Sequence, residues 1–307
     1  MTSSISAASG MLVAACASTQ ADSRTTAKRP VLLVHGAWHG AWCWGKVAPM
    51  LAAAGHPVVA IDLPGHGLNA LFPVAYDVQP RPGAFATERS PLAAITLADY
   101  ANAVAAAVES LLAAGFPAPM VVGHSMGGGA IQAAAELLGP AKIARLVYVA
   151  AFMPKDGTSM LSYTRGAEAP PSQLVPLLRA DPQAIGALRF DPGSLDSQYR
   201  AAMADVFYGK VDLATRRAAL NLLTCDIPAA PMATPVAVSN QRWGSIPRTY
   251  VRAAQDKAIP PVLQDRMIAQ ADAMTPSNRT QVVQLDSDHS PFFSMPDPLA
   301  RVLLSAV

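Results

Sequence analysis

Residues 123–127, with the sequence GHSMG, most strongly constrain what this chain can fold into. They match the pattern G-x-S-x-G, follow the apolar run at 120–122, and precede a helical pattern at 130–138. Glycines two residues to either side of a serine permit a tight, strained turn that exposes the hydroxyl at the end of a buried strand. The segment therefore predicts a strand, a sharp turn and a helix, with Ser125 as a candidate nucleophile.

A glycine-rich turn at the start of a helix can instead bind a phosphate group. This turn has no Walker lysine, and Ser125 stands where the dinucleotide pattern G-x-G-x-x-G requires a glycine. The nucleophile interpretation is therefore preferred.

Short apolar runs alternate with helical patterns over much of the chain. The predicted strands cover residues 31–34, 58–61, 120–122, 146–150, 248–253 and 280–285. The predicted helices cover residues 44–54, 96–114, 130–138 and 298–307, the second of them with Thr96 and Asp99 as its start signal. Strands separated by helices predict an α/β fold, with a mostly parallel sheet flanked by helices.

The alternation stops between residues 153 and 241, where prolines are frequent and helical patterns are short. We interpret this stretch as an inserted helical cap, which divides the core into residues 30–152 and 242–307. A length of 307 residues, with 51% hydrophobic and 14% charged residues, suits one large domain with a sizeable buried core.

Composition excludes several classes of function. The formal net charge is only +2 and there are no basic runs, so we expect no nucleic-acid partner. No apolar stretch reaches the ~20 residues of a membrane-spanning helix. The three cysteines, Cys16, Cys43 and Cys225, have no CxxC spacing, which predicts neither a disulfide framework nor a metal site. Buried thiols are the default interpretation, with Cys16 as the exception. A small neutral substrate fits these features, and the oligomeric state stays open, a homodimer included.

Two interpretations of residues 1–29 stay open. A small apolar run ending at Cys16 looks like the lipid-attachment site of a bacterial lipoprotein signal, which would place the protein in the periplasm or at the outer membrane. The same Ser/Thr/Ala-rich segment also fits a disordered N-terminus of a cytoplasmic protein.

A nucleophilic serine needs a base that removes its proton and an acid that orients the base. In chains with this strand–turn–helix nucleophile the order is serine, acid, histidine. His289 is the only histidine after Ser125, and it lies just beyond a predicted strand. Asp256 lies three residues past the strand at 248–253, at the carboxyl end where sites of α/β sheets gather. We therefore predict Asp256 as the acid and His289 as the base.

Three other aspartates are alternative candidates for the acid. Asp226 falls in the predicted cap and is the main rival. Asp286 and Asp288 flank the histidine so closely that their side chains rarely reach it, and we expect them to be solvated or to stabilise the turn.

The oxyanion formed when the serine attacks a carbonyl needs two preorganised donors, and backbone N–H groups can supply both. We predict the N–H of Met126, directly after the nucleophile, and that of Ala37, in the loop after the first strand. An ordinary tight turn with tryptophans in the core is the alternative for this loop.

Together these segments resemble the small α/β-hydrolases that include plant methylesterases, plant hydroxynitrile lyases and related bacterial esterases. The segments that carry the resemblance are residues 35–42, 123–128, 242–248, 255–256 and 288–291. The resemblance covers about residues 31–307 and implies the hydrolase fold, a helical cap, no cofactor and the same triad.

The resemblance also separates two activities. The lyases carry a threonine where Gly36 stands and a lysine where Ser290 stands. Lacking both, and with His124 before the nucleophile as is usual in the esterases, the chain resembles the esterase branch. We expect Gly36, His124, Trp38 and Ser290 at the substrate pocket. Serine-dependent hydrolysis of a carboxylic ester is the predicted function; a lyase or a non-catalytic ligand-binding protein is the alternative.

Residues 71–89 depart from the family pattern, because they form a longer, proline-rich loop with several aromatic residues. Two roles stay open for this loop, which either reshapes substrate entry or lies on the surface.

Overall fold

The computed structural model describes residues 28–165 and 172–307. The predictions for residues 1–27, including a lipid anchor at Cys16, lie outside the described residues.

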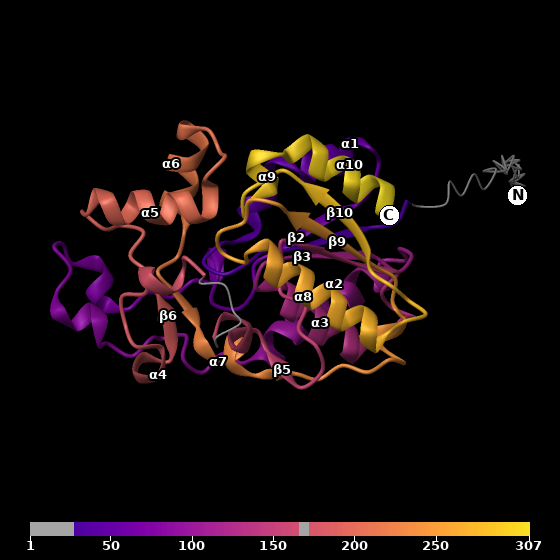
Figure 1. Ribbon diagram of the computed structural model, residues 1–307, viewed down its shortest axis with the longest axis horizontal. Helices are drawn as coiled ribbons and strands as arrows, with labels where there is room; N and C mark the ends of the chain where they lie inside the picture. Colours follow the sequence, from indigo (N-terminus) through magenta and orange to yellow (C-terminus); the bar gives the residue numbers. More distant parts are fainter. Residues whose placement is uncertain (1–27, 166–171) are drawn as a thin grey trace, which may run out of the picture.

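A six-stranded sheet forms the centre of the molecule (Figure 1). All its neighbouring strands are parallel, in the spatial order β10-β9-β4-β3-β1-β2. The strands are β1 (Val31–Val34), β2 (Val58–Ile61), β3 (Met120–His124), β4 (Arg145–Val149), β9 (Arg248–Ala253) and β10 (Gln281–Leu285). Because every strand runs the same way, all six carboxyl ends meet at one edge of the sheet. This arrangement confirms the predicted α/β class.

Helices cover both faces of the sheet. One face packs against α2 (Leu97–Ala113), α3 (Gly127–Leu138) and α8 (Pro261–Met274), and the other against α1 (Ala48–Ala53) and α10 (Pro296–Ala306). In β1, Leu32 and Val34 join the first core and Val31 and Leu33 join the second, because successive strand residues point to opposite faces. Burial on both sides explains why the sequence of β1 is a continuous apolar run.

The predicted helices form, but one of them is divided and two further helices, α8 and α9 (Pro291–Ser294), were not predicted. The helix α2 begins with a capping box, in which the Thr96 hydroxyl accepts the Asp99 N–H at 3.2 Å and the Asp99 carboxylate accepts the Thr96 N–H at 2.8 Å. The predicted helix at 44–54 is divided into a 3-10 helix, η1 (Ala41–Lys46), and α1, which has Pro49 in its first turn. The four-residue helix α9 precedes α10.

The chain between β4 and β9 leaves the sheet and forms a separate layer at the carboxyl edge. It contains the antiparallel pairs β5 (Thr158–Ser159) with β8 (Pro235–Val236) and β6 (Ala187–Arg189) with β7 (Asp226–Pro228). Its α-helices are α4 (Pro182–Ile185), α5 (Ser197–Tyr208), α6 (Leu213–Leu222) and α7 (Ala229–Ala233). Figure 1 shows α4, α5 and α6 to the left of the sheet. This layer coincides with the stretch in which the alternation of strands and helices lapses.

Residues 71–89 form two 3-10 turns, η3 (Val74–Asp77) and η4 (Gly83–Ala86), at the left edge of Figure 1. The loop is fastened to the inserted layer. Arg81 pairs with Asp191 at 2.9 Å, and the buried Arg189 donates to the carbonyls of Phe85 and Glu88. The loop therefore packs against the insertion and is bonded to it.

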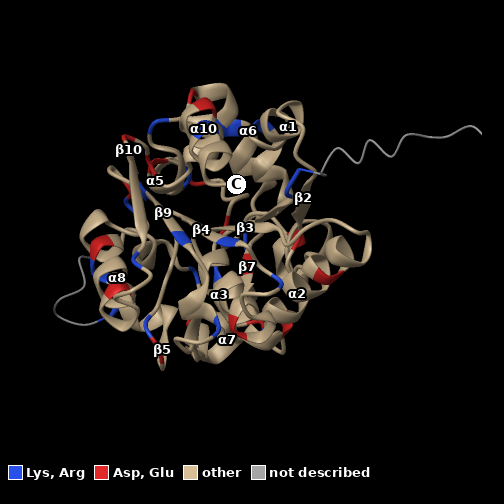
Figure 2. Cartoon of the chain, turned by 90° about the vertical axis from the view of Figure 1, so that its right-hand side faces the viewer, with Lys and Arg blue, Asp and Glu red and all other residues tan. Residues whose placement is uncertain are grey.

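In the cartoon of Figure 2, positions of Lys and Arg alternate with positions of Asp and Glu along the chain. Among the described residues, no helix is long and apolar enough to cross a membrane. Within the same ranges, no cluster of histidine, cysteine or acidic residues could hold a metal ion. Cys43 and Cys225 are buried free thiols, as predicted.

Candidate active site

Ser125 occupies the sharp turn between β3 and α3. Its backbone has a φ of +53°, which a residue with a side chain adopts only under strain, and the turn is fixed where the Ser125 carbonyl accepts the Phe152 N–H at 3.0 Å. Glycines flank it because nothing larger fits: a Cβ on Gly127 would lie 2.5 Å from the His35 carbonyl oxygen, and one on Gly123 2.8 Å from the Gly127 carbonyl oxygen. The two flanking glycines therefore make room for the strained turn at Ser125.

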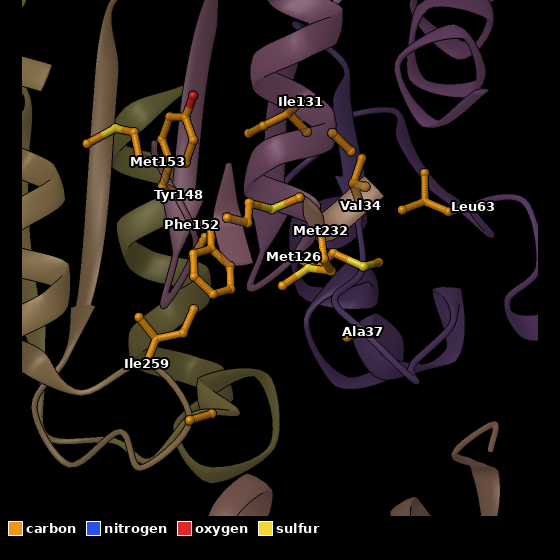
Figure 3. Close-up of a cluster of buried hydrophobic side chains, with 14 of the residues drawn as sticks. Val34, Ala37, Leu63, Met126, Ile131, Tyr148, Phe152, Met153, Met232 and Ile259 are labelled. Carbon is orange, nitrogen blue, oxygen red and sulfur yellow. The ribbon is translucent and has the colours of Figure 1, made fainter. Parts of the chain in front are cut away.

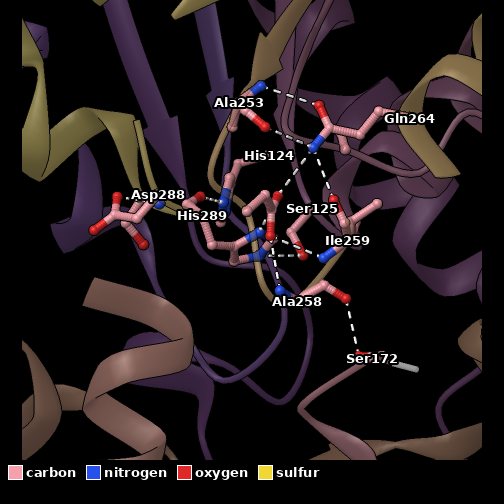
Figure 4. Close-up of polar contacts among 12 residues, drawn as sticks. His124, Ser125, Ser172, Ala253, Ala258, Ile259, Gln264, Asp288 and His289 are labelled. Carbon is pink, nitrogen blue, oxygen red and sulfur yellow. Dashed lines mark hydrogen bonds and ion pairs between the residues drawn. The ribbon is translucent and has the colours of Figure 1, made fainter. Parts of the chain in front are cut away.

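His289 lies between Ser125 and Asp256, in the order that proton transfer requires, and Figure 4 shows it beside Ser125. His289 Nε2 is 3.0 Å from Ser125 Oγ, and His289 Nδ1 is 2.8 Å from Asp256 Oδ2. The carboxylate accepts the hydrogen of Nδ1, which leaves Nε2 free to accept the serine proton. All three residues are buried, although they come from the ends of three different strands, β3, β9 and β10.

The Asp256 carboxylate is held by further donors. Its Oδ1 accepts the N–H groups of Ala258 and Ile259, each at 2.8 Å, and its Oδ2 accepts the Gln264 amide at 3.3 Å. Gln264 is fully buried on α8. These bonds fix the carboxylate that orients His289. Sequence reasoning missed Gln264, because nothing distinguishes it from a surface glutamine until α8 is packed.

The other aspartates have different partners. Asp226 forms a fully buried ion pair with Arg189 at 2.7 Å, and exposed Asp286 pairs with Lys210. Asp288 is buried and accepts the backbone N–H groups of Lys210 and Ser290. Among the described residues, none of the three bonds to His289.

Two backbone N–H groups next to Ser125 are free to bind an oxyanion. Within residues 28–165 and 172–307, the N–H groups of Ala37 and Met126 donate no hydrogen bond, although both residues are buried at the cavity described below. The Gly36 carbonyl, which shares a peptide plane with the Ala37 N–H, accepts a bond from His35 Nδ1 at 2.8 Å. Burial lowers the pKa of His35 well below its usual value, so its ring is neutral.

A cavity of about 300 Å³ opens from Ser125 toward the inserted layer. In Figure 3, Met126 and Phe152 from the core lie close to Met232 from the insertion and Ile259 from the loop after β9. Its walls are formed by Ala37, Trp38, Ser125, Met126, Phe152, Leu161, Thr164, Arg165, Ser172, Leu174, Val175, Leu178, Pro182, Gln183, Leu188, Ile227, Ala229, Met232, Ala233, Ala258 and Ile259. The lining is mainly apolar, so the cavity suits an apolar group attached to the reacting carbonyl.

Of the residues expected at the pocket, Trp38 lines the cavity, where its ring stacks on Phe190 at 4.0 Å. Gly36, His124 and Ser290 are not among the described lining residues. His124 lies behind the triad and donates from Nε2 to the His289 carbonyl at 2.8 Å. Gly36 is wedged between His124 and Ser125, and Ser290 is fully buried. The expectation of pocket contact therefore needs correction for these three: they pack against the triad residues and do not line the cavity.

The parallel sheet, the inserted layer and a buried serine on a strand-to-helix turn define the class of α/β-hydrolases. The comparison with protein families agrees, since the model described as "Alpha/beta hydrolase family" matches residues 31–302. The chain belongs to this family and, within it, to the methylesterase branch.

The branch follows from similar curated proteins. The chain is 31% identical to Methylesterase 18 of Arabidopsis thaliana over 290 residues, which cover 90% of this chain and 95% of that protein. It is 27% identical to Methyl jasmonate esterase 1 of Vitis vinifera, with 91% and 97% covered. These similarities confirm the predicted class of enzyme, a carboxylic ester hydrolase.

Solved structures show the same fold. A pyrethroid hydrolase from Sphingobium faniae JZ-2 matches with a TM-score of 0.69 and 24% identity, over 90% of this chain and 96% of that one. A methylesterase from Arabidopsis matches with a TM-score of 0.60 and 25% identity, over 91% and 98%.

Proposed function

We propose that this protein hydrolyses a carboxylic ester in two steps, with Ser125 as nucleophile, His289 as base and Asp256 as the group that orients the base. The observation that carries the proposal is the buried chain of contacts from Asp256 Oδ2 to His289 Nδ1 and from His289 Nε2 to Ser125 Oγ. Few arrangements other than nucleophilic catalysis require these three groups to be aligned.

In the first step, Ser125 Oγ forms a bond to the ester carbonyl carbon while its proton passes to His289 Nε2. The negative charge then lies on the carbonyl oxygen, which the free N–H groups of Ala37 and Met126 stabilise. The intermediate collapses, and the leaving alcohol takes the proton from His289. Water repeats the sequence on the acyl-enzyme, which releases the acid and restores Ser125.

For the substrate, we propose a methyl ester of an apolar carboxylic acid. The cavity of about 300 Å³ is at the lower end of the usual range for ligand pockets and is lined mainly by apolar side chains. We assign this cavity to the acyl group of the ester. The alcohol group then lies on the other side of Ser125 and is expected to be small. The names of the methylesterase relatives support the same alcohol. Residues 153–241 act in this proposal as a cap that closes the acyl site against water.

The lyase alternative is disfavoured at Gly36. A Cβ there would lie 2.7 Å from both His124 Nδ1 and Ser125 Cβ, so the threonine of the lyases would displace one of them. The site as built therefore excludes the group that would hold a cyanohydrin hydroxyl.

The proposal is tested with the Ser125→Ala variant. We expect it to lose turnover of methyl and nitrophenyl esters by a factor of about 10³ or more, and to lose labelling by a fluorophosphonate probe. Cyanide release from mandelonitrile, measured on the unaltered protein, checks the lyase alternative. Undiminished ester turnover in the variant would refute the assignment.

A further inference from the structure

Helix α5 of the insertion and the two residues that follow it contact all three loops that carry the proposed chemistry. Asp205 pairs with Lys257, next to Asp256, at 2.6 Å. The N–H of Lys210, two residues after the helix, donates to Asp288, next to His289, at 2.8 Å. The third contact joins Tyr208 to the loop of Ala37 through His39.

The hydrogens in this third contact have only one consistent arrangement. His39 Nδ1 is 2.7 Å from the Ala37 carbonyl oxygen, which can only accept, so Nδ1 carries the hydrogen. In a neutral ring Nε2 is then an acceptor, and the Tyr208 hydroxyl at 2.8 Å must donate to it. The result is a directed chain from Tyr208 through His39 to the Ala37 carbonyl.

Both side chains of the chain are kept neutral by burial. Desolvation lowers the pKa of His39 from 6.5 to about 3 and raises that of Tyr208 well above its usual value. The same arrangement of hydrogens therefore holds throughout the neutral pH range.

The Ala37 backbone depends on this support. The peptide before Ala37 is held by His35, through the Gly36 carbonyl, and the peptide after it is held by His39. The next residue, Trp38, has a φ of +60°, a strained value that persists only where surrounding bonds fix it. The Thr224 N–H also binds the Trp38 carbonyl at 3.0 Å, so loss of the His39 bond would leave the loop attached but would remove the support of the Ala37 carbonyl. We expect the Ala37 N–H then to shift relative to the oxyanion.

We propose that Tyr208 and His39 are positioning residues for the oxyanion hole, and that through them the inserted layer holds the Ala37 N–H in line with Ser125. This inference rests on the proposed esterase function. It assigns to α5 a part in the rate of the reaction, in addition to closing the site.

The test compares two tyrosines of the same helix. Tyr208→Phe removes only the hydroxyl that donates to His39. Tyr199→Phe is the matched control, because its hydroxyl is also buried and bonded, to the Leu177 carbonyl at 2.8 Å and the Asp191 N–H at 3.1 Å, but touches none of the three loops. Values of kcat and KM on one nitrophenyl ester, inhibition by a trifluoromethyl ketone, and the thermal midpoint are measured for both.

For Tyr208→Phe we expect kcat to fall about tenfold, less than the 10²–10³ lost when an oxyanion donor is removed outright. KM should stay within about twofold, and the inhibition constant of the ketone should rise by the same factor as kcat falls, because only the tetrahedral adduct uses the hole. Tyr199→Phe should keep kcat within about twofold even where its thermal midpoint falls. Wild-type kcat in Tyr208→Phe, or equal kcat losses in both variants, would overturn the proposal.

A second pair of variants tests the same proposal if the Tyr208→Phe protein fails to fold. His39→Asn keeps an N–H near the position of Nδ1, whereas His39→Ala does not, so the asparagine should retain at least about threefold more kcat. Equal rates would overturn the proposal. The Ser125→Ala variant in the same assay separates the two hypotheses: if it is active, the esterase assignment fails, and if it is inactive, the outcome bears on positioning alone.

Discussion

The floor and the wall of the active site are built in different ways. The floor consists of the polar residues Ser125, Asp256 and His289 at the ends of the sheet strands. Asp256 alone accepts four hydrogen bonds. The wall, contributed largely by the insertion, is a mainly apolar surface around residues such as Leu188 and Met232. Directional bonds fix the reacting atoms on the floor, whereas the wall selects by shape and apolar area. Changes to the floor should therefore alter kcat, and changes to the wall should alter which ester is preferred.

The largest effect is expected on the floor at Asp256. In Asp256→Asn an amide replaces the carboxylate that keeps the hydrogen of His289 on Nδ1. His289 then no longer presents Nε2 as the base, so kcat should fall by about 10³–10⁴. The matched control is Asp286→Asn, which alters an exposed carboxylate three residues before His289 and should change kcat by less than about twofold. Steady-state kinetics on a nitrophenyl ester measure both, and equal losses would contradict the assignment of the acid.

A smaller loss is expected from Gly36→Ala, again in the floor. The new Cβ would lie 2.7 Å from His124 Nδ1 and Ser125 Cβ, so the serine or its neighbour must shift, and kcat should fall about 10²-fold. Gly45→Ala is the control, because a Cβ there meets no atom within 4 Å. A Gly36→Ala enzyme with the wild-type kcat would show that the floor tolerates movement.

The smallest effect on rate is expected in the wall. Met232→Ala enlarges the cavity, so the ratio of kcat/KM for a longer acyl chain over a shorter one should rise about tenfold, with little change in the best kcat. Met203→Ala removes an equally large buried side chain from α5 away from the cavity, and should lower the thermal midpoint without shifting this preference. A series of esters with increasing acyl length provides the measurement. The distinction between floor and wall fails if both variants leave the preference unchanged.

Sequence alone predicted the strands of the sheet and grouped three polar residues at their ends for a physical reason. Strand β9 was predicted at its observed bounds from the return of the strand pattern after the insertion, although it carries Arg248 and Arg252. Because parallel strands end at one edge, Ser125, Asp256 and His289 could be grouped by their positions after strands. The structure brings these three within hydrogen-bonding distance.

What sequence could not supply depends on packing between distant segments. Tyr208 and His39 are 169 residues apart, and neither residue has a local pattern that pairs them. The resemblance to esterases and lyases predicted His124 and Ser290 at the pocket, but a resemblance in sequence does not determine which side of the triad a side chain occupies. Helix α8 begins with prolines and has a weak amphipathic pattern, so the sequence did not predict this helix. Its position is set by its packing against the sheet.

The position of the insertion also has a consequence for biosynthesis. Strand β4 ends at Val149 and its partner β9 begins at Arg248, so the whole insertion is translated before the two can pair. On a ribosome that adds about 5–20 residues per second, the edge of β4 stays unpaired for several seconds. The emerging chain then presents the apolar sequence RLVYV as an open template for aggregation. Chaperone dependence of this protein should therefore be greatest in the interval between synthesis of these two strands.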